Sequence, residues 1–125
     1  MAEALKLPRF SVGVGDRFAH QAKAQLAACV MAAEAGVEVA PVWNKSNREH
    51  TIIGTEPSQT RAAADAAVKA LGWKEPYFLD ADHITLKTVE RFLAPCDFLR
   101  WMLRRRLGSR RRRLMLRRFW SGIRS

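Results

Sequence analysis

Strand-like apolar runs alternate with helical segments along most of this chain, and this order limits the fold more than any other feature. Strands are predicted at residues 10–15, 37–43, 77–84 and from 96 onward, and helices at 19–35, 60–71 and 85–93. Gly36 and Gly72 follow two alanine-rich helices at the usual C-terminal cap position. The alternation predicts an α/β fold with a parallel sheet and right-handed crossovers. About three βα units are too few to close an eight-stranded barrel, which takes about 250 residues, so we expect an interrupted domain.

The positive charge of the chain is concentrated at its C-terminal end. The net charge is +10, yet residues 100–125 hold eleven Arg and no Lys, Asp or Glu. Residues 1–99 hold the other eleven basic side chains and all twelve acidic ones, which leaves them at −1. We therefore divide the chain into a near-neutral globular part, residues 1–98, and an Arg/Leu-rich tail, residues 99–125, which we expect to be helical or disordered.

Three interpretations of this tail are open. Its arginines can neutralise nucleic-acid phosphates while Trp101, Phe119 and Trp120 stack on bases. Its Arg and Leu residues can also form an amphipathic helix at a membrane surface. The third interpretation, which we favour, is a shift of reading frame, because Arg and Leu runs in GC-rich coding sequence become Ala, Gly and Val runs in another frame. Residues Arg100 to Arg118 would then bind polyanions non-specifically, with no specific nucleic-acid partner.

The remaining composition predicts a reduced, cytoplasmic protein. Cys29 and Cys96 are far apart in the sequence and form no CxxC pair. The N-terminus has no basic segment followed by an apolar run, so no secretory signal is evident. No apolar stretch approaches the length of about 18 residues that a membrane span requires.

The strongest candidate site lies where the predicted strand 77–84 ends. Its apolar start leads into Asp80, Asp82 and His83. In α/β proteins such strand ends hold functional side chains, because a rigid strand positions them well. The alternative is purely structural, since Asp82 or Thr85 can serve as the N-cap of the next helix. Both interpretations are open at this point.

Two other strand ends carry polar side chains. The run at residues 44–51 contains Asn44, Lys45, Arg48 and His50, a set that suits an anionic, hydroxyl-rich ligand, although a solvated loop is the plainer interpretation.

The first predicted strand ends in Gly13-Val14-Gly15, followed by Asp16 and Arg17. Phe18 takes the place of the third glycine of a dinucleotide-binding loop, so we reject that motif. The two glycines instead indicate close approach of the backbone.

Three ordered blocks of sequence resemble a known family. They are PRFSVGVGDRF at residues 8–18, PVWNKS at 41–46 with REHTIIG at 48–54, and FLDADHI at 78–84. Over residues 8–98 the chain resembles the N-terminal part of the tagaturonate/fructuronate epimerase family of hexuronate catabolism. The match ends after Phe98, where the family is expected to continue with a strand carrying Val-Asp or Ile-Asp.

This resemblance implies a (β/α)8 TIM-like barrel and a metal-dependent isomerase that inverts one carbinol carbon of a keto-hexuronate. It implies that Asp82 and His83 bind substrate hydroxyls or support the metal, and that Lys45, Arg48 or Arg17 holds the substrate carboxylate, with His50 as an orienting group. The candidate substrate-binding residues are Asp16, Arg17, Asn44, Lys45, Arg48, His50, Asp80, Asp82 and His83.

The same resemblance places the principal catalytic residues and most ligands of the divalent cation on later strands. We therefore expect this chain to be inactive alone and to bind no metal by itself. Part of a barrel also leaves strand edges unpaired, which predicts self-association. The alternative function is a small basic protein that binds nucleic acid or a membrane surface through its tail.

Overall fold

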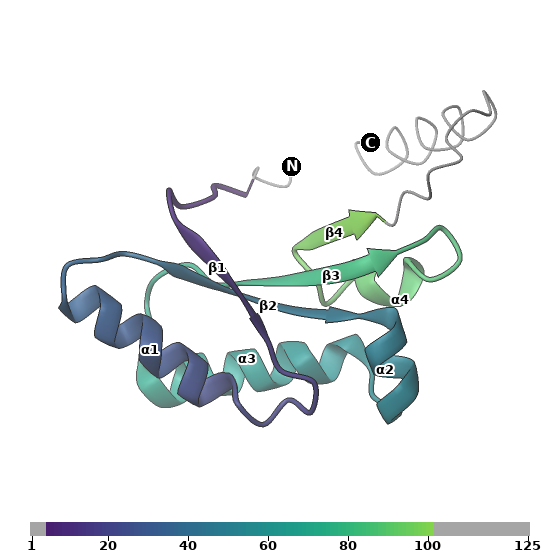
Figure 1. The fold of residues 1–125 in the computed structure, drawn as a ribbon, viewed down its shortest axis with the longest axis horizontal. Helices are drawn as coiled ribbons and strands as arrows, with labels where there is room; N and C mark the ends of the chain where they lie inside the picture. The colour runs from purple at the N-terminus through teal and green to yellow at the C-terminus, as the bar shows by residue number, and fades with distance from the viewer. Residues whose placement is uncertain (1–4, 102–125) are drawn as a thin grey trace.

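A computed structural model describes residues 5–101 of the chain, and the tail from residue 102 onward lies outside the described residues (Figure 1). The elements are β1 (Ser11–Gly15), α1 (Ala22–Glu34), β2 (Ala40–Ser46), α2 (Asn47–Ile53), α3 (Pro57–Leu71), β3 (Phe78–Ile84), α4 (Glu90–Leu93) and β4 (Phe98–Trp101). Within residues 5–101, no helix has both the length and the apolar character needed to cross a bilayer.

The four strands form one parallel sheet in the order β1-β2-β3-β4. The predicted α/β fold with a parallel sheet is therefore confirmed, while the complete barrel stays a prediction. β1 and β4 each pair on one side only within the described part of the chain. These two edges are where the predicted self-association would occur.

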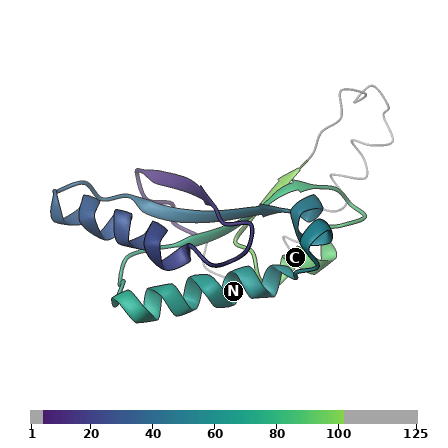
Figure 2. The same ribbon diagram turned by 60° about the horizontal axis from the view of Figure 1, so that its bottom comes forward.

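The two faces of the sheet differ. Helices α1 and α3 lie together on one face, as Figures 1 and 2 show. There Trp43 and Leu79 pack against Leu26 and Ala64, and all four side chains are almost inaccessible to solvent. Burial of these apolar side chains is the main stabilising contribution to the fold.

The other face carries a smaller apolar cluster of Ala40, Val42 and Phe78, against which Phe98 packs. No helix of residues 5–101 covers this face, and it is called the helix-free face. Because side chains alternate along a strand, it also carries Asn44 and Asp80, which are paired in the β2–β3 register.

Helix α1 and strand β2 each begin three residues later than expected. Helix α1 starts at Ala22 instead of residue 19, because Ala19 adopts a left-handed conformation with φ 56°. Strand β2 covers Ala40–Ser46 instead of residues 37–43. The end of α1 explains this shift, since the Val37 N–H still donates to the Ala32 carbonyl at 2.9 Å.

Helix α2 was not predicted, since residues 44–51 were expected to form a loop. Ser46 ends β2 and caps α2: its hydroxyl accepts from the Glu49 N–H at 3.2 Å, and its own N–H donates to Glu49 Oε2 at 3.0 Å. This reciprocal pair is a capping box, and its Ser-x-x-Glu pattern is visible in the sequence. Gly54 ends the helix with φ 68°, a conformation that glycine adopts without strain.

Helix α4 is shorter than predicted, and strand β4 runs past the predicted domain boundary at residue 98. Helix α4 covers Glu90–Leu93 instead of residues 85–93, because residues 85–88 form a turn in which the Thr85 N–H donates to Thr88 Oγ1 at 3.1 Å. Strand β4 extends to Trp101, so residues 99–101 of the predicted tail pair with β3.

Candidate functional site

The candidate site is a groove at the C-terminal edge of the sheet. Parallel strands end at the same edge, so the segments after β1, β2 and β3 meet there. The polar and charged side chains that line the groove include Arg17, Ser46, Arg48, Glu49, Asp82 and His83. Four of these were predicted site residues, namely Arg17, Arg48, Asp82 and His83.

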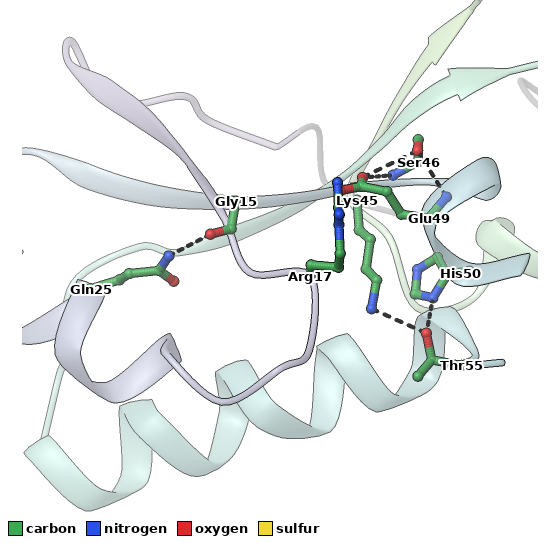
Figure 3. A network of polar contacts seen from close by, with 8 residues as sticks. All are labelled: Gly15, Arg17, Gln25, Lys45, Ser46, Glu49, His50 and Thr55. Atoms are coloured by element: carbon green, nitrogen blue, oxygen red, sulfur yellow. Dashed lines mark hydrogen bonds and ion pairs between the residues drawn. The ribbon is translucent and has the colours of Figure 1, made fainter. Parts of the chain in front are cut away.

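Charged groups on one side of the groove are partly paired. Arg17 Nε lies 3.6 Å from Glu49 Oε1 (Figure 3). Burial by itself raises the pKa of Glu49, but hydrogen bonds from Ser46 and the charge of Arg17 together bring it below its usual range. Glu49 is therefore ionised and offsets part of the charge of Arg17. Arg48 lines the same groove and forms no ion pair within residues 5–101, so its guanidinium is available to an anion.

The carboxylate of Asp82 contacts both the imidazole ring and the backbone N–H of His83. Asp82 Oδ2 lies 2.8 Å from His83 Nδ1, and Asp82 Oδ1 accepts from the His83 N–H at 3.0 Å. His83 has φ 55°, and the β3–β4 register shifts at this point. The pairing orients the imidazole and leaves Nε2 for a ligand. Asp82 does not cap helix α4, whose N-cap position is Val89; its carboxylate instead bonds to His83.

Lys45 and His50 do not line the groove but belong to a buried polar network. Lys45 Nζ donates to Thr55 Oγ1 at 3.1 Å, and Thr55 Oγ1 lies 2.9 Å from His50 Nδ1 (Figure 3). Both side chains are buried. The pleat of β2 turns its odd-numbered residues toward the helices, so Lys45 faces them, whereas His50 is buried as part of α2.

Burial controls the protonation of this internal network. It lowers the pKa of Lys45, although the carboxylates of Glu49 and Asp16 act in the opposite direction. Burial, followed by the charges of Lys45 and Arg91, lowers the pKa of His50 to about 4. His50 is thus neutral at pH 7, and the Thr55 hydroxyl hydrogen-bonds to His50 Nδ1 while its oxygen accepts from Lys45 Nζ. The network joins β2, α2 and the segment before α3.

Asp16 and Asn44 do not line the groove either. The carboxylate of Asp16 accepts from the His20 and Gln21 N–H groups at 3.1 and 2.9 Å, so it organises the turn before α1. Asn44 lies on the helix-free face of the sheet. A Cβ at Gly13 would lie 3.3 Å from Asn44 Nδ2, which agrees with the predicted close approach at this glycine.

Asp80 lies on the helix-free face, two residues before Asp82. Its side chain is buried, and Arg100 Nε lies 2.6 Å from Asp80 Oδ2.

Two supporting residues were missed at the level of sequence. Arg91 donates to Asn47 Oδ1 at 3.1 Å and to the Thr55 carbonyl at 2.9 Å, and it pairs with Glu56 at 3.0 Å. Gln25 donates to the Gly15 carbonyl at 2.7 Å and accepts from Trp43 Nε1 at 2.9 Å. Both join distant parts of the sequence, and no local pattern indicates them.

The described residues do not fit a metal ion. Among residues 5–101, no three His, Cys, Asp or Glu side chains are arranged to hold one. Asp82 and His83 offer two donors, but these are already bonded to each other.

Comparison of the chain with protein-family models, with curated proteins and with solved structures finds no match.

Proposed function

We propose that residues 5–101 are the first βα units of a sugar-acid epimerase, and that the groove binds the carboxylate end of a keto-hexuronate such as tagaturonate. The strand order supports a barrel-type arrangement. Successive strands lie side by side in the order β1-β2-β3-β4, and α1 and α3 cover the same face. An open doubly wound sheet instead reverses its strand order and carries helices on both faces.

The single observation that carries the proposal is the composition of the groove. It combines two arginines with an Asp82–His83 pair at the C-terminal edge of a parallel sheet. A guanidinium binds a carboxylate through two parallel N–H donors, so Arg48, together with Arg17, is suited to the acid group. His83 Nε2 is suited to a substrate hydroxyl, because the second ring nitrogen is fixed by Asp82.

The pairing of Asp82 and His83 also suits proton transfer at a bound hydroxyl. An imidazole held by a carboxylate takes up a proton at the other nitrogen and returns it. The resemblance places the remaining catalytic groups and the divalent cation on later strands. Turnover is therefore proposed to need residues beyond those of this chain.

Arg48→Gln is expected to weaken tagaturonate binding by about 10- to 100-fold, because a charged pair to the carboxylate is lost. Isothermal titration calorimetry on the full chain measures this change. Arg9→Gln is the matched control, since Arg9 lines a separate groove with residues such as Val37 and Trp73. It removes the same charge and is expected to leave the affinity unchanged. Equal losses in the two variants would show that net charge alone attracts the ligand, and would contradict the proposal.

A further inference from the structure

Asp80 is a carboxylate in the middle of the helix-free face of the sheet. It pairs in register with Asn44 on β2 and with Phe98 on β4. Its side chain is only 1% exposed to solvent. The apolar cluster of Ala40, Val42 and Phe78 lies on the same face. This is an unusual place for a charge, because carboxylates are seldom buried without several hydrogen-bond donors around them.

The hydrogen-bonding capacity of Asp80 is unused within residues 5–101. Neither carboxylate oxygen has a hydrogen-bond partner there. Arg100 Nε is 2.6 Å from Oδ2, so the two groups form an ion pair by distance but not an aligned hydrogen bond. Burial raises the pKa of Asp80, the charge of Arg100 opposes this, and the charge of Asp82 adds to it. A buried polar group without partners is rare in folded proteins, and a functional role is one of the explanations for it.

The position of Asp80 connects it to the groove. Asp80 and Asp82 are two residues apart on β3, so both belong to the same face, about 7 Å apart along the strand. Asp82 lines the groove. Arg100, which pairs with Asp80, has a side chain that is 61% exposed and is free to turn toward solvent. A ligand that extends from the groove along the helix-free face therefore reaches Asp80.

We propose that Asp80 is a subsite that binds hydroxyl groups of the sugar acid at the end remote from its carboxylate. This inference rests on the proposed function. An ionised carboxylate accepts several O–H donors, which matches the adjacent hydroxyl groups of a sugar chain. The arginines of the groove select an anionic ligand, so the donors at Asp80 are hydroxyls of that anion. Binding moves the guanidinium of Arg100 off the carboxylate, and the ligand hydroxyls take its place.

The test compares two ligands of the same length by calorimetry with the full chain. Tagaturonate has the carboxylate, the ketone and the hydroxyls, whereas 5-oxohexanoate has the same carboxylate and ketone but no hydroxyl. Asp80→Asn is expected to reduce the preference for tagaturonate over 5-oxohexanoate by about 10- to 100-fold, since charged hydrogen bonds are lost. Arg48→Gln is expected to weaken both ligands alike and to keep the preference.

The outcomes separate the inference from the proposed function. Tagaturonate binding with an unchanged preference in Asp80→Asn overturns the subsite and leaves the proposed function standing. No tagaturonate binding to the wild-type chain overturns both.

Arg100→Ala provides a second variant that leaves the buried carboxylate in place. It is expected to keep or increase the preference for tagaturonate, and a loss of preference in this variant would contradict the subsite.

Discussion

Replacing Phe92 with alanine is expected to lower the free energy of unfolding by about 3–5 kcal/mol. The Phe92 side chain is fully buried and packs with Ala81, Ile84 and Val89, and its ring centroid lies 5.7 Å from that of His50. It thereby joins α4 to β3 and to α2. The substitution removes apolar contacts and leaves a cavity that the single turn of α4 cannot close. Urea denaturation followed by circular dichroism measures the change.

Leu93→Ala is the matched control for this substitution. Leu93 is the next residue of α4, but it is 46% exposed. Its replacement is expected to change the free energy of unfolding by no more than about 1 kcal/mol, because little buried surface is lost. Similar losses for the two variants would mean that α4 does not pack on β3 through Phe92.

The second large effect is a loss of stability on acidification that comes from His50. Its pKa in the folded chain is lowered from 6.5 to about 4 by burial and by the charges of Lys45 and Arg91. Below about pH 6.5 the unfolded chain takes up a proton at this residue, while the folded chain resists protonation until about pH 4. The unfolded state then binds more protons, so stability falls across this window. The full loss from His50 is roughly 3 kcal/mol.

Urea denaturation near neutral pH and near pH 5 measures this contribution. Between about pH 7 and about pH 5, His50 is expected to account for about 2 kcal/mol of the loss in the wild-type chain. His50→Gln lacks the titrating imidazole, so its loss over the same interval is expected to be smaller by that amount. An identical pH dependence in the two proteins would show that His50 is not held neutral in the folded state.

Local patterns in the sequence predicted the fold class. The order of strands and helices follows from the apolar periodicity, and Gly36 and Gly72 ended their helices as expected, because both adopt positive φ. Helix α2 was missed because its polar surface resembles a loop, although the Ser46-x-x-Glu49 capping box was present in the sequence.

The candidate site was predicted less completely, for a reason that lies in β2. The strand was expected to end at residue 43, but it continues through Asn44 and Lys45 to Ser46. Within a strand, adjacent side chains point to opposite faces, so Lys45 is directed to the helices while Asn44 lies on the helix-free face. A loop has no such alternation. The contacts of Arg91 with Asn47 and Thr55 join residues 44 and 36 positions apart, which no local pattern encodes.

The most direct test of the account is a titration of the isotopically labelled full chain with tagaturonate, followed by amide chemical shifts in NMR spectra. If the groove binds the sugar acid, the largest shifts will fall in residues that line it, namely residues 46–49 together with Asp82, His83 and Thr85. Shifts concentrated around Arg9, Glu38 and Trp73, which line a separate groove, or the absence of any shift, would contradict the central claim.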